Sequence, residues 1–133
     1  MRAFKTFIKF SIVGASGTIV NLLVFNILLF SVFFSKHYII NNTISFLFAV
    51  TNNFYWNNKW TYRSKGRGKT LHSKYLQFFI IGLLTLAANN MILHMLVEHF
   101  TFNKRLGNLC AILFCSFFNF IANTTITFKD KAS

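Results

Sequence analysis

The chain contains few acidic residues, few cysteines and no proline. Its only acids, Glu98 and Asp130, do not form a pair, so the sequence offers no two carboxylates for general acid–base catalysis. Cys110 and Cys115 are five residues apart, a spacing that fits no metal or redox motif, and we interpret them as buried apolar residues. We therefore predict that the protein is not an enzyme and needs neither a metal ion nor another cofactor.

Positive charge is abundant and unevenly distributed. The chain has 14 Lys and Arg residues, a formal net charge of +12, and 54% hydrophobic residues. A nucleic-acid-binding domain would interleave its basic residues through the fold, whereas a membrane protein collects them in loops. Here the stretches 10–35 and 76–97 contain no Lys, Arg, Asp or Glu. The pattern therefore predicts an integral membrane protein that does not bind nucleic acid.

Four apolar segments are long enough to cross a membrane, namely 7–33, 38–56, 76–97 and 106–126. About 20 such residues span the hydrocarbon core, and all four should be helices because isolated strands would leave backbone groups unpaired in lipid. We expect no cleavable signal peptide, since the first run is too long and no small-residue cleavage site follows it. The predicted fold class is all-α, with four transmembrane helices.

The basic residues define an orientation for these segments. Eleven of them lie at the N-terminus, between the second and third spans and at the C-terminus, whereas three lie in the other two connections. Positive charge collects on the cytoplasmic side, so we predict that both termini and the middle segment are cytoplasmic in a multi-pass protein of the cell membrane. Aromatic residues near the span ends are typical of membrane interfaces: Tyr38, Trp56, Trp60, Tyr62 and Tyr75.

The two halves of the sequence resemble each other. Residues 10–14 and Asn21 correspond to 78–82 and Asn89 at an offset of 68. At an offset of 66, Asn42 corresponds to Asn108, Asn53 to Asn119, Asn57 to Asn123, and Thr61-Tyr62 to Thr127-Phe128. Asparagine is costly in a membrane span, so hydropathy alone does not explain its recurrence. We predict one domain, 1–133, built from two parallel two-helix repeats at about 4–63 and 72–129.

Pairs of asparagines lie near the predicted cytoplasmic ends of the second and fourth spans. Asn53 and Asn57 are four residues apart and share a helix face, as do Asn119 and Asn123. The cations expected at the same level are Lys9, Lys59, Arg63, Lys74 and Lys129. Amides beside cations suit a phosphate, since the amides supply directed donors and the cations supply charge. We predict a lipid-phosphate site; the alternative is that the cations only meet anionic lipid.

A further group of cations lies in 64–69, the only linker-like stretch of the chain. For Lys65, Arg67 and Lys69 we expect contact with anionic lipid, worth about 1 kcal/mol each, and not with a specific ligand.

Other notable residues lie inside the first and third spans. Asn21 and Asn89 are expected well inside the bilayer, where lipid offers an amide no hydrogen-bond partner. They form either a shared polar lining for a ligand or hydrogen bonds between neighbouring helices, and both alternatives stay open. Gly14 and Gly82 each precede another small residue by three positions, so we predict that both glycines allow close helix packing.

Several of these residues form a recognisable series. The pattern Phe-x-x-x-Gly with Asn seven residues later, the segment Asn53-x-x-x-Asn57-Asn58-Lys59-Trp60-Thr61-Tyr62, and the echo Asn119-x-x-x-Asn123 with Thr127-Phe128 resemble the GtrA-like family. That family includes teichoic acid glycosylation proteins of the GtcA type. The resemblance covers about 4–129. In the second copy, Thr124 and Thr125 replace the expected basic residue.

The resemblance implies translocation, or flipping, of an undecaprenyl-phosphate-linked monosaccharide across the bacterial cytoplasmic membrane. The sugar would then glycosylate teichoic acid or another cell-surface polysaccharide. A groove lined by polar groups would lower the cost of taking the charged headgroup through hydrocarbon. The alternative is a non-catalytic membrane subunit that anchors or stabilises a polyprenyl-phosphate glycosyltransferase, and a remoter one is a small-solute transporter.

Partners are expected because four helices make a thin bundle. Such a bundle can hardly enclose a sugar phosphate alone, so we predict a homo-oligomer, most simply a dimer, or a complex with a glycosyltransferase. Membrane lipid and the lipid-linked sugar are the other expected partners.

Overall fold

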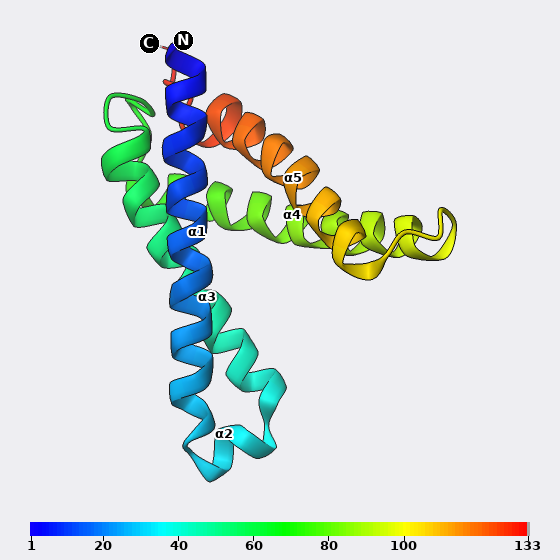
Figure 1. Ribbon diagram of the computed structural model, residues 1–133. Coiled ribbons are helices and arrows are strands. Elements are labelled where there is room, and N and C mark those ends of the chain that lie inside the picture. The colour runs from blue at the N-terminus through cyan, green and yellow to red at the C-terminus, as the bar shows by residue number, and fades with distance from the viewer. Residues whose placement is uncertain (133) are drawn as a thin grey trace. The chain divides into compact units, whose positions relative to one another are not determined.

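The computed structural model describes residues 1–132, without the side chains of Tyr38, Ile39, Lys104 and Arg105. The interfacial role predicted for Tyr38 therefore lies outside the described residues. The regular elements are α1 (Arg2–Leu29), α2 (Val32–Lys36), α3 (Tyr38–Trp56), α4 (Leu71–Glu98) and α5 (Lys104–Ala122), with π-helical turns η1 (Asn57–Thr61) and η2 (Asn123–Thr127) (Figure 1). No strand occurs between residues 1 and 132, so the all-α prediction is confirmed.

Three helical segments are long and apolar enough to cross a membrane, namely Arg2–Leu29, Leu71–Glu98 and Leu106–Thr127. The predicted second span coincides with α3, which has 19 residues but carries four asparagines that lower its hydropathy. Among the described residues, α3 is therefore not one of the apolar spans. The protein is a membrane protein with several apolar helices, and the four-span topology with both termini inside stays a prediction.

Two helices differ from the predicted bounds. The first apolar run is not one helix, because α1 ends at Leu29 and the short α2 follows Ser31. The third predicted span lies in α4, which starts at Leu71, before the apolar run. It starts there because the Thr70 side chain accepts a hydrogen bond from the Ser73 backbone N–H at 3.2 Å. This N-cap satisfies one of the donors left free at a helix start.

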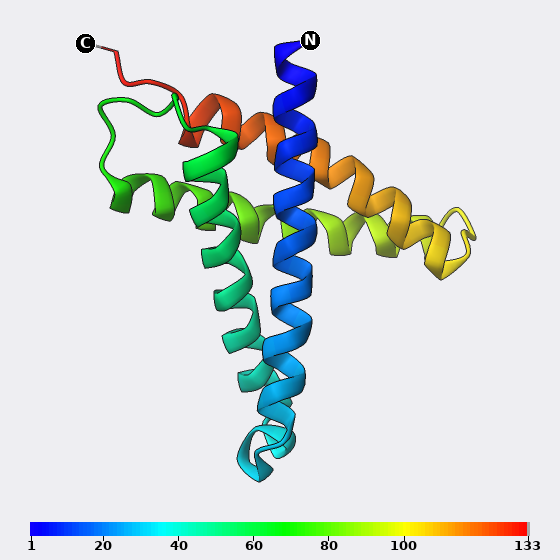
Figure 2. The same ribbon diagram turned by 60° about the vertical axis from the view of Figure 1, so that its left-hand side comes forward.

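The chain forms two compact units, of which unit 1 is Met1–Arg63. Within unit 1, α1 and α3 lie side by side as an antiparallel pair, with α2 in their connection (Figures 1 and 2). Away from the π-turn end, Asn41 holds the pair together: its Nδ2 donates to the Phe25 carbonyl at 3.1 Å and its Oδ1 accepts from Ser45 Oγ at 3.3 Å. A fully buried amide is thereby satisfied, as a low-polarity environment requires.

Unit 2 begins at Ser64 and consists of α4, α5 and η2. Its first residues fold back on its last ones: the Arg67 N–H donates to Asp130 Oδ1 at 2.7 Å, and the Lys131 N–H donates to the Arg67 carbonyl at 2.9 Å. Gly66 and Gly68 adopt φ of 72° and 78°, which glycine tolerates and other residues rarely adopt. The stretch predicted to be a linker is thus a folded part of unit 2.

Both units end in the same structure. In each, the last helix passes into a five-residue π turn, closed by Tyr62 N–H to the Asn57 carbonyl at 2.8 Å and by Phe128 N–H to the Asn123 carbonyl at 2.9 Å. Tyr62 and Phe128 are buried, which corrects the interfacial role predicted for Tyr62, and each packs edge-on against a phenylalanine 6.4 Å away, Phe10 or Phe78. The two π turns lie 66 residues apart, the offset found in the sequence. The single domain and the parallel arrangement of the two repeats stay predictions.

Candidate functional site

The Asn119, Asn123 and Thr127 side chains at the end of unit 2 form a closed hydrogen-bond network. Asn123 Nδ2 donates to Asn119 Oδ1 at 2.6 Å and to the Asn119 carbonyl at 3.0 Å, and Thr127 Oγ1 donates to Asn123 Oδ1 at 2.9 Å. Asn123 and Thr127 are fully buried. The Asn123 amide is therefore bonded within its own helix, and the phosphate contact of Asn119 and Asn123 stays a prediction.

The matching series in unit 1 is not closed by hydrogen bonds. Asn53 Oδ1, Asn57 Oδ1 and Thr61 Oγ1 are all buried, and none has a hydrogen-bond partner among the residues that the structure describes. Asn57 as a whole is only 1% exposed. Buried polar atoms are nearly always paired in proteins, so three unpaired oxygens on one helix call for an explanation. We call these residues the acceptor triad.

A glycine accounts for the difference between the two series. A Cβ added at Gly17 would lie 2.1 Å from Asn53 Oδ1, so the Asn53 amide occupies the space that a side chain would fill. The corresponding residue of unit 2, 68 positions on, is Thr85, whose hydroxyl donates to the Ile81 carbonyl at 2.7 Å. Asn53 can therefore point at α1, whereas Asn119 bonds along its own helix.

The close approach in unit 1 is at Gly17 and not at Gly14. A Cβ at Gly14 would meet no described atom within 4 Å, so the packing role predicted for Gly14 is not found within unit 1. Its counterpart Gly82 is partly buried in α4. Sequence spacing alone did not distinguish Gly14 from Gly17, because both lie on the same helix face three residues apart.

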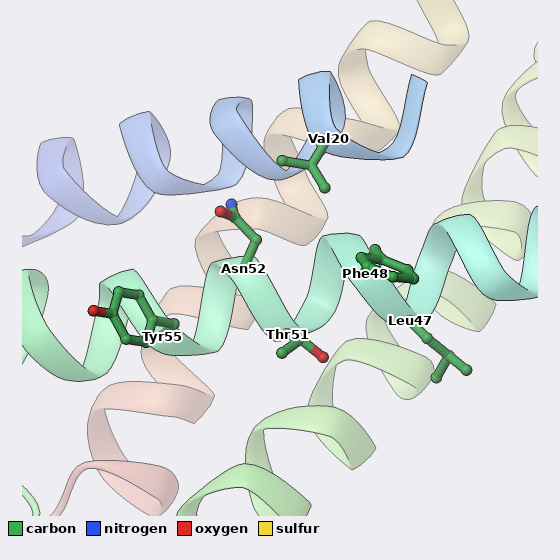
Figure 3. A pocket seen from close by; sticks show the side chains of 6 residues that line it. All are labelled: Val20, Leu47, Phe48, Thr51, Asn52 and Tyr55. Atoms are coloured by element: carbon green, nitrogen blue, oxygen red, sulfur yellow. The ribbon is translucent and has the colours of Figure 1, made fainter. Parts of the chain in front are cut away.

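Two adjoining pockets lie along α1 and α3. The first, about 430 Å³, is here named the tryptophan pocket and is lined by Ile12, Val13, Ser16, Trp56, Lys59 and Trp60. The second, about 600 Å³, is named the phenylalanine pocket and is lined by Val20, Leu47, Phe48, Thr51, Asn52 and Tyr55 (Figure 3). Asn52 points toward α1 in Figure 3, and its Nδ2 donates to Ser16 Oγ at 3.0 Å. This bond joins a residue of one pocket to a residue of the other.

Two lysines lie at or next to the tryptophan pocket. Lys59 lines it, with its Nζ 5.2 Å from the Tyr55 ring centroid, and the Lys9 Nζ lies 5.2 Å from the Trp60 ring centroid. These are cation–π distances. Because unit 1 has no Asp or Glu in its sequence, no carboxylate of this unit neutralises these charges. Arg63 is exposed and does not line either pocket.

The remaining predicted residues lie apart from these pockets. Asn21 and Asn89 are partly buried in α1 and α4, and neither lines the tryptophan or phenylalanine pocket. Their shared polar lining stays a prediction. Sequence reasoning missed Ser16, Asn52 and Thr61, and it interpreted Trp56 and Trp60 only as interfacial residues. Knowing that α1 pairs with α3 would have been needed to predict that Ser16 lies opposite Asn52.

Taken together, the apolar helices and the pockets along α1 and α3 define a helical membrane protein with two mostly apolar pockets on unit 1. The sequence matches the family described as GtrA/DPMS, transmembrane domain, over residues 9–132. The chain belongs to this family, and the resemblance found from its motifs is confirmed. No curated protein matches the sequence.

Proposed function

We propose that the protein moves an undecaprenyl-phosphate-linked monosaccharide between the leaflets of the bacterial cytoplasmic membrane. The sugar would serve glycosylation of teichoic acid or another cell-surface polysaccharide. Membership of the GtrA/DPMS family is consistent with translocation of a polyprenyl-phosphate sugar. The observation that carries the proposal is the groove on unit 1, which is basic and aromatic at one end and apolar further along α1 and α3.

The tryptophan pocket suits the headgroup. An ammonium group binds phosphate as a point charge, and Lys59 and Lys9 lie at this pocket without a carboxylate from their own unit. Tryptophan rings have an apolar body and a polar edge, a combination that favours the headgroup level of a bilayer. In unit 2, by contrast, Lys69 Nζ is bonded to the Ile126 carbonyl, to the Thr127 carbonyl at 3.4 Å and to Gln77 Oε1 at 3.2 Å.

The phenylalanine pocket suits the prenyl chain. Most of its lining is apolar, with Val20, Leu47 and Phe48 at the end away from Tyr55. Contact with these side chains replaces lipid contacts at little cost, so the chain can follow the groove while the headgroup stays with Lys59. The energetic obstacle to flipping is desolvation of the phosphate and hydroxyls. The groove lowers that obstacle without any chemical step, and we infer that the protein has no catalytic activity.

Assembly is part of the proposal. Both pockets are open-sided grooves on a two-helix unit, so a second copy of the chain, or a glycosyltransferase, would be needed to enclose the headgroup during passage. The second candidate function is a membrane subunit that stabilises such a glycosyltransferase. It is favoured by the exposed aromatic face of α5, where Phe114 and Phe118 lie 4.7 Å apart by ring centroid and could meet a partner helix.

Reconstitution tests the proposal. The full chain is placed in vesicles with labelled undecaprenyl-phosphate hexose, and leaflet-to-leaflet movement is followed by an impermeant reagent. We expect faster movement than in empty vesicles, and a loss of about tenfold in a Lys9→Gln/Lys59→Gln variant, equivalent to about 1.4 kcal/mol. Lys5→Gln, an exposed residue one turn from Lys9, is the matched control. Movement no faster than in empty vesicles would reject transport and favour the subunit role.

A further inference from the structure

The acceptor triad of unit 1 carries three buried oxygens without donors, although the same series in unit 2 is fully bonded. The backbone cannot explain the contrast, because both series end in equivalent π turns. An internally closed arrangement is therefore available to this sequence pattern, and unit 1 does not adopt it. Orphaned buried acceptors of this kind mark sites for a missing donor.

The triad lies directly beside the tryptophan pocket. On a helix, residues three apart are neighbours, so Asn53 adjoins Trp56 and Asn57 adjoins Trp60, and both tryptophans line that pocket. The Asn53 amide also rests against Gly17, the residue after the pocket-lining Ser16. A ligand whose phosphate is held by Lys59 thus has its next group close to the triad.

The chemistry of the triad selects the kind of group. Amide and hydroxyl oxygens accept hydrogen bonds, so the partner must donate. A carboxylate only accepts: the Thr61 hydroxyl could donate to it, but Asn53 Oδ1 and Asn57 Oδ1 would stay unpaired. A metal cation is disfavoured because Lys9 and Lys59 adjoin the site and unit 1 has no acid. Sugar hydroxyls donate hydrogen bonds and are uncharged, and in a lipid-linked sugar they lie next to the phosphate.

We propose that Asn53 Oδ1, Asn57 Oδ1 and Thr61 Oγ1 form a selectivity site that accepts hydroxyl hydrogens from an uncharged, hydroxyl-rich sugar headgroup. This inference rests on the proposed function and narrows it, since it makes Thr61 a specificity-determining residue and assigns sugar recognition to unit 1 alone. Because the three oxygens are shielded from solvent, a sugar reaches them only when the α1–α3 contact at Gly17 loosens. A dehydrated site of this kind discriminates strongly against a ligand that lacks the matching hydrogen bonds.

Binding measurements on the full chain in lipid nanodiscs test the inference. The probes are short-chain polyprenyl phosphates that carry glucose, galactose, glucuronic acid or no sugar. We expect at least one hexose carrier to bind about tenfold more tightly than the sugar-free and glucuronic acid carriers. Thr61→Val, which removes the hydroxyl and keeps the shape, should shrink that ratio severalfold. Thr61→Ser should restore it, and Thr127→Val in unit 2 should leave it unchanged.

Several results would overturn the inference. An unchanged ratio in Thr61→Val would mean that the triad holds only water, and tighter binding of the glucuronic acid carrier would contradict an acceptor site. Equal loss in Thr61→Val and Thr127→Val would indicate a general packing defect. The proposed function is tested separately. If the wild-type protein shows no translocation in vesicles, transport is rejected even when the binding ratio is as expected. If translocation occurs but the ratio is unchanged in Thr61→Val, only the selectivity site is rejected.

Discussion

Thr61 and Thr127 occupy the same place in two matching π turns, but the Thr127 hydroxyl is bonded at 2.9 Å to Asn123 whereas the Thr61 hydroxyl oxygen has no described partner. The two units thus share a backbone and differ in what their polar groups do. In unit 2 the network holds the helix end together. In unit 1 the corresponding oxygens are buried without a described partner, and our proposal makes unit 1 the binding repeat and unit 2 the structural one.

The cations show the same division. In unit 2, Lys69 donates to the last carbonyls of η2 and to Gln77, a favourable position for positive charge at a helix C-terminus. The residue that corresponds to Gln77 in unit 1 is Lys9, and the residue that corresponds to Lys59 in unit 2 is Thr125. Unit 1 therefore has two cations at its groove, and uncharged residues occupy both corresponding positions of unit 2.

The largest expected effect concerns the glycine that keeps the triad open. Gly17→Ala places a Cβ where the Asn53 amide lies, 2.1 Å from its Oδ1, so the amide must turn away and unit 1 should come to resemble unit 2. We expect translocation in vesicles to fall by tenfold or more, while an overpacking cost of about 1–3 kcal/mol in the free energy of unfolding is partly offset by about 1 kcal/mol of helix propensity.

Gly14→Ala is the control for this change, because no described atom lies within 4 Å of its new Cβ. It should leave translocation intact and stabilise the helix by up to about 1 kcal/mol. Equal losses of translocation in both variants would show that Gly17 has no special relation to the groove.

The next prediction compares how Thr61 and Thr127 contribute to the free energy of unfolding. Thr127→Val removes a buried hydrogen bond and leaves Asn123 Oδ1 unpaired, so it should lower the free energy of unfolding by about 1–3 kcal/mol. Thr61→Val removes an oxygen that is already unpaired and should be neutral or stabilising. Denaturant unfolding in mild detergent measures both; a comparable cost in the two variants would mean that Thr61 is bonded in the native protein.

A smaller effect concerns the folded segment at the start of unit 2. Lys69→Ala removes the cation bonded to the end of η2, and we expect a loss of about 1 kcal/mol in stability. Lys129→Ala, an exposed lysine two residues after η2, should cost less than half as much. Thermal unfolding of the two variants at low and high salt checks this, since equal shifts would place Lys69 in solvent.

The smallest effect concerns the bond between the pockets. Ser16→Ala deprives Asn52 Nδ2 of its acceptor across the α1–α3 interface and should cost about 0.5–1.5 kcal/mol. Ser11→Ala removes only a bond to the Phe7 carbonyl of the same helix, on an exposed face, and should be nearly neutral. Amide hydrogen exchange in α3 reports the difference, and identical protection in both variants would contradict the bridging role of Ser16.

The sequence was sufficient for the coarse fold. Long runs without charge predict membrane helices, and the recurrence of Asn53 and Asn57 as Asn119 and Asn123 predicts two matching halves. It did not reveal which half has unpaired oxygens, because that depends on side-chain rotamers and on the space that Gly17 leaves for the Asn53 amide. The folded stretch after Ser64 was also missed, since its main anchor, Asp130, lies more than 60 residues away along the chain.

Cross-linking provides the most direct test of the central claim that unit 1 binds the headgroup and unit 2 does not. Ile12 lines the tryptophan pocket, and Ile80 is its counterpart in unit 2, with similar exposures of 53% and 46%. A photoreactive amino acid is placed at either position in the full chain, in vesicles that contain labelled undecaprenyl-phosphate hexose. We predict labelling at position 12 that excess unlabelled carrier suppresses, and only background labelling at position 80. Equal, competable labelling at both positions would contradict the account.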